Sequence, residues 1–393
     1  MTGIPVAARV GALARSGLFR LLAEGRDRDI VDLALGVPGA PATPPGLVES
    51  ACAALRDGVN QYELPDGNPE LRRRIAAELS APTDPRTELT ITVGGSEALT
   101  SAVLATVDPG DEVIVFEPFY ENFISAIALA GGIPRPVTVR APDWRYDAAE
   151  LRAAFGPRTR AILLCTPNNP TGHLLTRSEF TEIALLCERW NVIAISDEIY
   201  SAYVYDGNRH VSAADIPGLR ERGIVIGSLS KSHAVSGWRI GYLRAAAALT
   251  EPIRRVHAAV CGGAAAPLQE AAARAAAESD FWRPTDLSVQ RDMAVSIFDE
   301  FGFRCIPPDG GCYTMADIRE FTGEDCESLA YRLVRETGVM VAPGKFFYSA
   351  PGAGDHLVRI AFNRRPAVLD EARRRLAAHR RGTLDDLADL ATD

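Results

Sequence analysis

Lysine is almost missing from this sequence. Only Lys231 and Lys345 occur among its 42 basic residues, and the other 40 are arginine. Arginine stays charged at every accessible pH, whereas lysine can become a neutral amine. Each of the two lysines is therefore a candidate for chemistry that arginine cannot perform.

Positive charge is also in deficit overall, because 51 acidic residues outnumber the basic ones and give a net charge of −9. This balance argues against a nucleic-acid partner bound by phosphate neutralisation. No run of about 18 uncharged apolar residues occurs, which argues against a membrane-spanning helix. The first residues, MTGIPVAARVGALARSG, lack the continuous apolar core of a secretory signal. We therefore expect a cytoplasmic protein without nucleic-acid or membrane partners.

Disulfide and metal-binding patterns are missing as well. The seven cysteines are scattered without a CxxC pair, and none of the six histidines lies in HxxxH spacing. Scattered cysteines in odd number are typical of free thiols in a reducing compartment and not of a disulfide framework. The sequence predicts no protein-held metal ion.

A regular alternation of segments is present instead. The chain has 393 residues, 47% of them hydrophobic, which is more than one core at about 150 residues per domain. Amphipathic helical segments separate six apolar segments, LTITVGG (89–95), EVIVF (112–116), PRPVTV (134–139), RAILLC (160–165), NVIAIS (191–196) and GIVIGS (223–228). This alternation predicts an α/β fold with a mostly parallel sheet covered by helices on both faces.

The pattern changes after residue 285, where a long helical segment precedes short strand candidates. These candidates are FRCI (303–306), CYTMAD (312–317) and LVRIAF (357–362). They predict a smaller α+β domain. The expected organisation is an N-terminal arm that belongs partly to the small domain (1–44), a large domain (45–285) and a small C-terminal domain (286–393).

Polar side chains follow the predicted strands at the edge where ligands collect in open α/β sheets. In chain order these are Gly95, Ser96 and Glu97, then Tyr120, Asn169, Asp197 with Tyr200, and finally Ser228, Ser230, Lys231 and Arg239. Some have structural alternatives: Asp197 could cap a helix, Tyr200 could be half-buried core, and Asn169 could shape a proline-flanked turn. Their joint occurrence at one edge favours a single site.

This combination suits the chemistry of pyridoxal phosphate (PLP). A strand-end lysine can form a Schiff base with a carbonyl, and PLP further needs a carboxylate at its ring nitrogen, a phosphate cradle and an aromatic neighbour. Asp197 fits the carboxylate, and Asn169 and Tyr200 can donate hydrogen bonds to the ring oxygen. The groups that suit the phosphate belong to Ser96, Ser228, Ser230 and Arg239.

Six ordered segments carry a resemblance to a known family. They are LALGVPG (33–39), YELPDGNPELRRRIA (62–76), CTPNNPTG (165–172), SDEIY (196–200), SLSKSHAVSGWRIGY (228–242) and VRIAF (358–362). The chain resembles the fold type I aminotransferases of classes I and II over nearly its whole length. The resemblance implies a large domain with a mostly parallel seven-stranded sheet, a smaller α+β C-terminal domain, and PLP as the cofactor.

The resemblance also implies roles for single residues. Lys231 matches the Schiff-base lysine, Asp197 the partner of the ring nitrogen, and Tyr200 with Asn169 the contacts of the ring oxygen. The phosphate site is matched by Arg239, Ser228, Ser230 and the amides of Gly95, Ser96 and Glu97. Tyr120 takes the place of the aromatic residue stacked on the ring, which is more usually Trp or Phe in the family.

Further matches concern the substrate and a second subunit. Arg359 matches the arginine that binds the substrate α-carboxylate, Asn169 is expected beside it, and Gly36 matches a glycine whose backbone approaches the same carboxylate. Tyr62 matches a tyrosine that reaches the cofactor phosphate of the neighbouring subunit. The resemblance therefore implies a homodimer with shared active sites.

The expected function is a PLP-dependent transaminase of amino acid metabolism or biosynthesis. It would move an amino group between an L-amino acid and a 2-oxo acid by a ping-pong Schiff-base mechanism. A PLP-dependent lyase or cyclase is the main alternative, because the same fold and lysine support those reactions. A remote alternative is an aminotransferase-like sensor domain, which would need an added DNA-binding domain, and the family pattern begins already near residue 33.

Three chemically capable residues are expected to have structural roles. Lys345 is interpreted as a solvated loop lysine, with the mouth of the active site as the alternative. We interpret His233 as a packed turn residue and Cys165 as packing beneath the sheet.

Overall fold

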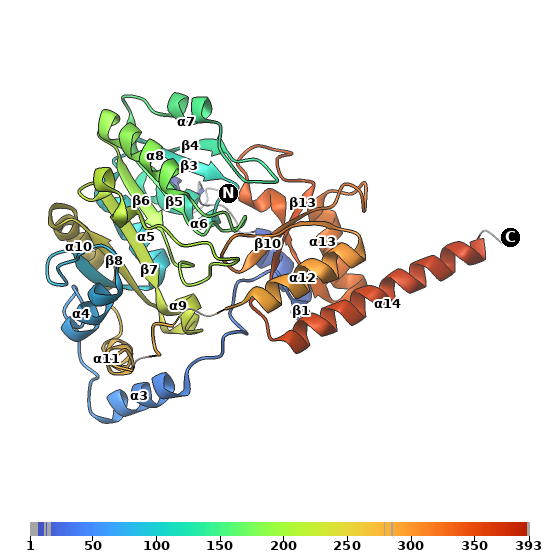
Figure 1. Ribbon diagram of the computed structural model, residues 1–393, viewed down its shortest axis with the longest axis horizontal. Coiled ribbons are helices and arrows are strands. Elements are labelled where there is room, and N and C mark those ends of the chain that lie inside the picture. The colour runs from blue at the N-terminus through green and yellow to red at the C-terminus, as the bar shows by residue number, and fades with distance from the viewer. Residues whose placement is uncertain (1–6, 12, 14–16, 279, 284–285, 391–393) are drawn as a thin grey trace, which may run out of the picture.

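The computed structural model describes residues 7–11, 13, 17–278, 280–283 and 286–390, and its central element is a seven-stranded sheet (Figure 1). Its order is β2-β8-β7-β6-β5-β3-β4, and only β8 runs antiparallel to its neighbours. The strands are β2 (Leu89–Val93), β3 (Glu112–Glu117), β4 (Ile133–Thr138), β5 (Thr159–Cys165), β6 (Ile193–Asp197), β7 (Gly223–Ser228) and β8 (Ile240–Ala245). The predicted α/β fold with a mostly parallel sheet is confirmed.

Helices cover both faces of this sheet. One face carries α5 (Gly94–Thr106), α6 (Glu121–Ala130) and α10 (Ala247–Cys261), and the other carries α7 (Ala148–Ala154) and α8 (Arg177–Trp190). In β3, Val113 and Val115 pack toward the first face, whereas Ile114 and Phe116 pack toward the second. Because successive strand side chains point to opposite faces, a strand buried on both sides reads as a continuous apolar run.

A further layer closes the end of the sheet formed by β2 and β8. It contains α3 (Pro45–Arg56), α4 (Pro69–Glu78) and α11 (Ala266–Ala275). Leu47 of α3 and Leu71 of α4 share a hydrophobic cluster with Ile91 of β2 and Ile240 of β8. The segment that precedes β2 is thereby fixed against the sheet.

A second group of elements lies beside the central sheet. Its four-stranded antiparallel sheet has the order β12-β13-β10-β9, and β1 pairs with β11 in parallel. The strands are β1 (Val31–Asp32), β9 (Arg304–Ile306), β10 (Tyr313–Asp317), β11 (Val339–Met340), β12 (Ala342–Pro343) and β13 (Leu357–Ala361). The accompanying helices are α2 (Gly17–Gly25), α12 (Ser288–Phe301), α13 (Cys326–Thr337) and α14 (Pro366–Leu390). Leu18 and Leu33 belong to the same core cluster as the side chains of α12, α13 and α14, so an early segment packs among late ones.

Four strands, β1, β8, β11 and β12, are not indicated by the sequence patterns. β8 follows directly on the turn 236–239 and contains Gly241, Tyr242 and Arg244, so it forms no continuous apolar run. β1, β11 and β12 have only two residues each, which is too short for any periodicity. These strands are defined by pairing with tertiary partners, because they are too short or too mixed in polarity for a sequence pattern to mark them.

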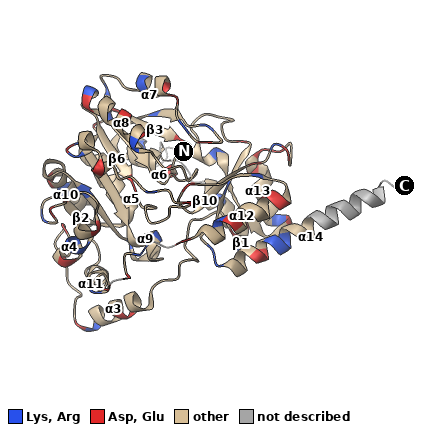
Figure 2. Cartoon of the chain, in the orientation of Figure 1, with Lys and Arg blue, Asp and Glu red and all other residues tan. Residues whose placement is uncertain are grey.

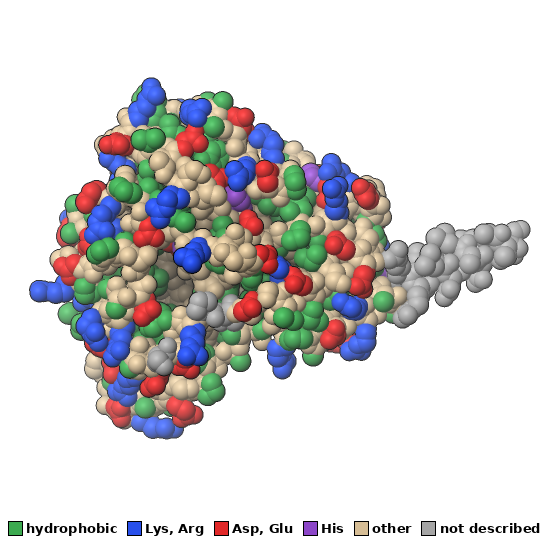
Figure 3. All heavy atoms as spheres, in the orientation of Figure 1, with side chains coloured by type: hydrophobic (Ala, Val, Ile, Leu, Met, Phe, Trp, Pro, Cys, Tyr) green, Lys and Arg blue, Asp and Glu red, His purple; other side chains and the backbone are tan. Residues whose placement is uncertain are grey.

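Charged residues lie mainly on the peripheral helices and loops, whereas the central strands carry few (Figure 2). On the face seen in Figure 3, basic and acidic side chains alternate without a large area of one sign. Among the described residues, no helix combines the length and the apolar character needed to cross a membrane.

Candidate active site

A cavity of about 280 Å³ lies where the strands of the central sheet end. It brings together most of the predicted site residues, namely Gly36, Gly95, Ser96, Tyr120, Asn169, Asp197, Tyr200, Ser228, Ser230, Lys231, Arg239 and Arg359. These residues come from sequence positions more than 300 apart. The predicted convergence at one edge of the sheet is therefore what the fold produces.

Lys231 lies on the short helix α9 (Leu229–Ser232), immediately after β7. Its Nζ donates a hydrogen bond to the backbone oxygen of Gly36 at 2.8 Å. Among the described residues, no carboxylate forms an ion pair with Lys231. Burial lowers the pKa of this amine, and the nearby guanidinium groups of Arg359 and Arg239 lower it further. The site thus stabilises the charged form of Lys231 less than water does.

Asp197 ends β6 and is almost fully buried. Burial raises the pKa of this carboxyl to about 7, although the backbone N–H of Ile199 donates to its Oδ1 at 3.2 Å. Within the described part of the chain, Asp197 has no ion-pair partner. A cationic group beside it, such as a protonated pyridine nitrogen, would stabilise its ionised form, and this need fits PLP.

The start of α5 forms a cradle that suits a phosphate group. Gly94 has φ = +74°, and a Cβ at this position would lie 2.5 Å from Nη2 of Arg239. A glycine is therefore required for the guanidinium to cover the exposed amides of the helix start. Ser228 Oγ donates to the backbone oxygen of Ile240 at 3.1 Å and lies 2.8 Å from Ser230 Oγ, so both hydroxyls line the same wall.

Arg359 belongs to β13, and its guanidinium group is held between two aromatic rings and by two neutral hydrogen-bond acceptors. Its guanidinium lies 4.2 Å from the ring centre of Tyr313 and 4.6 Å from that of Phe347. Nη1 donates to Oδ1 of Asn169 at 2.8 Å, and Nη2 donates to the backbone oxygen of Ala34 at 2.6 Å. The buried Nε has no hydrogen-bond partner among the described residues. The arginine keeps both charge and donors for a carboxylate ligand.

Tyr313 is a site residue that the sequence patterns did not indicate. Its hydroxyl lies 3.1 Å from that of Tyr200, and a Cβ at Gly36 would lie only 1.8 Å from it. The glycine at position 36 is thus needed for the backbone to approach Tyr313 and Lys231 together. The alternation of β10 marks Tyr313 only as an inward-facing residue, and Phe347 likewise carries no signal beyond its apolar character.

Two predicted site residues lie outside the cavity wall. The Glu97 side chain points away from the cavity and accepts hydrogen bonds from the Val93 backbone, at 3.0 Å, and from Ser101. Only the backbone of Glu97 belongs to the helix start. Tyr62 is 98% exposed and borders a separate surface hollow with residues 262–267, so it does not reach the cavity of its own chain.

Three further residues, His233, Lys345 and Cys165, were expected to have structural roles. His233 is buried and bonded to Ser232 Oγ and the backbone oxygen of Phe281, which confirms a packed turn residue. Lys345 pairs with Asp325, Glu327 and Asp355 and does not line the cavity. Cys165 is buried and packs in the hydrophobic cluster on the α5 and α6 face of the sheet, as expected. It also lines the cavity, because it ends β5 and its Sγ accepts a hydrogen bond from the backbone N–H of Asn169 at 3.4 Å.

A lysine, a buried carboxylate and a helix-start cradle at the carboxyl edge of a mostly parallel sheet define a PLP enzyme of fold type I. The model of the family described as aminotransferase class I and II matches residues 28–376. The chain belongs to this family.

Three similar proteins illustrate the relationship. A probable N-succinyldiaminopimelate aminotransferase of Mycobacterium tuberculosis is 36% identical over 366 residues, covering 88% of this chain and 91% of that protein. Human kynurenine–oxoglutarate transaminase 1 is 31% identical, covering 87% and 90%. The solved structure of N-succinyldiaminopimelate aminotransferase from Mycobacterium tuberculosis superposes with a TM-score of 0.90 at 34% identity, covering 95% of this chain and all of the other.

The predicted class of enzyme is therefore confirmed. The chain is a PLP-dependent aminotransferase, a transferase that moves an amino group between an amino acid and a 2-oxo acid. The lyase, cyclase and sensor alternatives are not favoured by these relatives.

Proposed function

We propose that this aminotransferase acts on L-amino acids with uncharged, mainly apolar side chains. The observation that carries the proposal is the set of cations in the cavity wall, which among the described residues comprises Lys231, Arg239 and Arg359. Arg239 covers the helix start and Lys231 follows β7, so Arg359 is left for the α-carboxylate of the substrate. A second carboxylate on the substrate would find no further cation in this part of the chain.

The apolar residues that line the cavity support the same substrate class. They include Leu18, Phe19, Leu35, Val37 and Phe347. Phe19 is 71% exposed and Val37 is 52% exposed, so a bound apolar side chain would remove both from water. Among the compounds in the relatives' names, kynurenine agrees with this choice, whereas oxoglutarate and N-succinyldiaminopimelate carry a further carboxylate.

Lys231 and Asp197 are the proposed catalytic pair, together with Tyr200. PLP, when bound, withdraws electrons from the substrate α-carbon. Lys231 Nζ holds the cofactor aldehyde between turnovers, and its lowered pKa suits it to take the α-proton as a neutral base and to return it. The Asp197 carboxylate would pair with the ring nitrogen of bound PLP. Tyr200 and Asn169 donate hydrogen bonds to the ring oxygen.

The remaining residues of the cavity position the two ligands. Arg359 would bind the α-carboxylate in two-pronged fashion, and the backbone of Gly36 would approach the same group. The phosphate is held by the amides of Gly95, Ser96 and Glu97, the hydroxyls of Ser96, Ser228 and Ser230, and the guanidinium of Arg239. Tyr120 accepts a hydrogen bond from Asn122 Nδ2 at 2.6 Å and would stack on the ring of bound PLP.

The functional unit in this proposal is a homodimer with shared sites. The almost complete exposure of Tyr62 is unusual for an aromatic side chain, and burial against a second copy would remove this cost. In the partner's site, Tyr62 would reach the cofactor phosphate.

A mixed dimer tests this sharing. One subunit carries Tyr62→Phe and the other carries Lys231→Ala. If Tyr62 acts in trans, both changes affect one site, and the single site with Lys231 keeps wild-type cofactor affinity. Cofactor affinity weakened at that site to the level of the Tyr62→Phe homodimer would show that the tyrosine acts within its own chain.

The domain division and the compartment also belong to this proposal. The shared core of Leu18, Leu33 and the C-terminal helices supports an arm (1–44) that joins the small domain (286–393), with the large domain (45–285) between them. All seven cysteines are free, which supports a reducing cytoplasm.

The substrate class is tested by single-turnover reactions of the PLP form with individual amino donors, followed by cofactor absorbance. L-phenylalanine, L-kynurenine and L-leucine should convert the cofactor to its amino form with higher kcat/KM than L-aspartate and L-glutamate. A preference for the dicarboxylic donors would contradict the proposal. A donor that returns the original spectrum while releasing ammonia would contradict amino-group transfer.

A further inference from the structure

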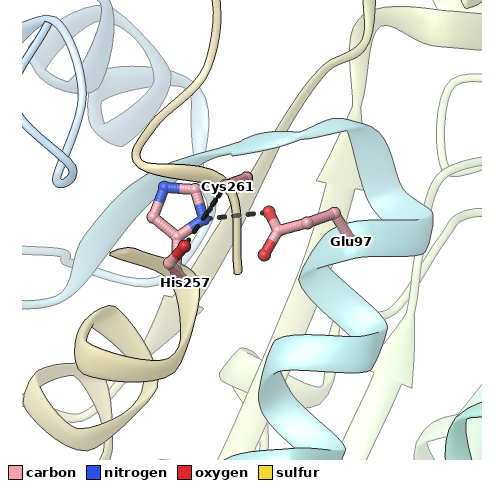
Figure 4. Close-up of side chains that lie close together, drawn as sticks. All are labelled: Glu97, His257 and Cys261. Atoms are coloured by element: carbon pink, nitrogen blue, oxygen red, sulfur yellow. Dashed lines mark hydrogen bonds and ion pairs between the residues drawn. The ribbon is translucent and has the colours of Figure 1, made fainter. Parts of the chain in front are cut away.

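Three side chains that could hold a metal ion, Glu97, His257 and Cys261, lie close together where α5 begins and α10 ends (Figure 4). Glu97 comes from the first turn of α5, and His257 and Cys261 come from the last turns of α10. Their ligand atoms all lie within 4.8 Å of one another. The function described above uses none of these three side chains.

The distances within the cluster approach those of a tetrahedral metal site. His257 Nδ1 lies 3.0 Å from Glu97 Oε2 and 3.3 Å from Cys261 Sγ. A tetrahedral Zn²⁺ with its usual bond lengths places a nitrogen about 3.3 Å from an oxygen ligand and about 3.5 Å from a sulfur ligand. These two pairs need shifts of only a few tenths of an ångström to admit the ion. The third pair, the Glu97 carboxylate oxygen and Cys261 Sγ, lies within 4.8 Å and would close to about 3.5 Å around the ion.

The chemistry of the three ligands selects the kind of ion. A carboxylate oxygen, an imidazole nitrogen and a thiolate sulfur form a mixed set that suits Zn²⁺, whereas Mg²⁺ and Ca²⁺ prefer oxygen ligands throughout. His257 and Cys261 are four residues apart on one helix, so their side chains share a face. Both helices pack against the central sheet, which gives the ligands rigid supports.

A second cluster in the described residues provides a contrast. Asp325, Cys326 and Asp355 also lie within 4.8 Å of one another. The ammonium group of Lys345 already lies 3.4 Å from Asp325 and 3.7 Å from Asp355. The chain's own cation thus neutralises that cluster, whereas no lysine or arginine forms an ion pair with Glu97 among the described residues.

We propose that Glu97 Oε2, His257 Nδ1 and Cys261 Sγ bind one Zn²⁺ ion per chain, with water as the fourth ligand. The ion replaces the hydrogen bond between His257 Nδ1 and Glu97. The Nδ1 proton shifts to Nε2 of the same imidazole, and the thiol proton of Cys261 leaves to solvent. Glu97 directly follows Ser96, so the ion ties the helix start at the active site to the end of α10. His257 is fully buried and Cys261 is half-buried, which places the water ligand on the side of Cys261.

The test is a Zn²⁺ titration of the PLP-loaded dimer in competition with a chromophoric chelator. Wild type should take up one ion per chain. Cys261→Ser should weaken this uptake by at least about 10-fold, because a zinc site loses affinity steeply when its ligand set is disturbed. Cys52→Ser is the matched control, because Cys52 is likewise half-buried but belongs to no such cluster among the described residues. It should bind like wild type.

Cd²⁺ supplies a direct readout of the sulfur ligand. Wild type and Cys52→Ser should show the ultraviolet charge-transfer band of a Cd²⁺–thiolate bond, and Cys261→Ser should lack it. His257→Gln should weaken Zn²⁺ uptake as well. The proposal is overturned if wild type takes up no stoichiometric ion, or if Cys261→Ser binds Zn²⁺ as tightly as wild type.

Discussion

The two lysines of this chain occupy opposite environments, and the contrast explains how one of them becomes reactive. Lys231 lines the cavity beside Arg359 and Arg239, and burial together with these cations lowers its pKa. Lys345 lies outside the cavity among three acidic side chains. Burial acts to lower the pKa of Lys345, but the hydrogen bond to Glu327 and the charges of Asp325 and Asp355 outweigh it and raise the pKa.

The contrast shows that residue type alone does not make a nucleophile. A lysine surrounded by carboxylates keeps its proton and serves as an ion-pair partner. A lysine placed among guanidinium groups and away from water releases its proton more readily and can act as a base or form a covalent bond. The protein therefore assigns the role through the neighbours and not through the amine itself.

Removal of Lys231 is expected to have the largest effect. Lys231→Ala should lower the rate of transamination by at least about 10⁴-fold, because both the covalent anchor and the proton-transfer group are lost. The fold should persist, which circular dichroism and dimer size would check. Steady-state turnover of the variant near the wild-type rate would mean that another group carries the chemistry.

Removal of the Asp197 carboxylate, the proposed partner of the ring nitrogen, should have the next largest effect on the rate. Asp197→Ala should lower kcat by about 10²- to 10³-fold, because a preorganised charge at the ring nitrogen is lost. Rapid-mixing kinetics of the first half-reaction would measure this loss. An unchanged rate would exclude Asp197 from the ring-nitrogen site.

The cofactor-free protein offers a second measurement on Asp197. Its carboxyl has a pKa of about 7 in the folded chain, against 3.8 for the ordinary group. The folded form therefore keeps this proton while the unfolded chain releases it, and the free energy of unfolding should fall as pH rises from about 4 to about 7. Asp197→Asn should flatten this part of the profile in urea unfolding experiments, and an identical profile for the variant would contradict the raised pKa.

Replacement of Arg359 should weaken substrate binding and also raise the pKa of Lys231, because the Arg359 charge lowers it. Arg359→Gln should raise KM for the amino donor by about 10- to 150-fold, the equivalent of one charge-assisted hydrogen bond. The control substrate is an amine without a carboxylate, for which the variant and wild type should have similar KM values, whereas the altered pKa of Lys231 should change kcat equally with both substrates. An equal rise in KM with both substrates would assign Arg359 a structural role.

Lys345 should give the smallest effect. Lys345→Ala should leave turnover unchanged and lower the free energy of unfolding by about 1 kcal/mol, as for other solvent-accessible ion pairs. Because the folded pKa of Lys345 is raised above its ordinary value of 10.5, its contribution is complete below pH 10.5 and is lost as pH rises through the folded pKa. Urea unfolding at pH 8 and above pH 10.5 should show this convergence of wild type and variant, whereas a loss of turnover would place Lys345 in the site.

The sequence predicted the central sheet well, because β3, β5, β6 and β7 are buried on both faces and therefore read as apolar runs. It also predicted which residues follow these strands. It did not predict β8 or the two-residue strands, whose extended conformation depends on partners distant in sequence.

The active site likewise contains residues that the sequence predicted and residues that it did not. The polar residues at strand ends were predictable, because lysine, aspartate and asparagine are costly to bury and therefore stand out from an apolar pattern. Tyr313 and Phe347, which clamp Arg359, were not predictable, because an aromatic residue in a buried strand or turn looks like ordinary core. Cys165 packs in the core as expected, but its place in the cavity wall was not predictable, because alternation along β5 gives the face of a side chain but not its distance from the cavity.

The most direct test of the contrast between the lysines is borohydride reduction of the PLP-loaded enzyme followed by peptide mass spectrometry. Reduction fixes the cofactor covalently on the amine that holds it. The account predicts the added mass on the peptide that contains Lys231, with the Lys345 peptide unmodified. Cofactor mass on the Lys345 peptide, with Lys231 unmodified, would contradict it.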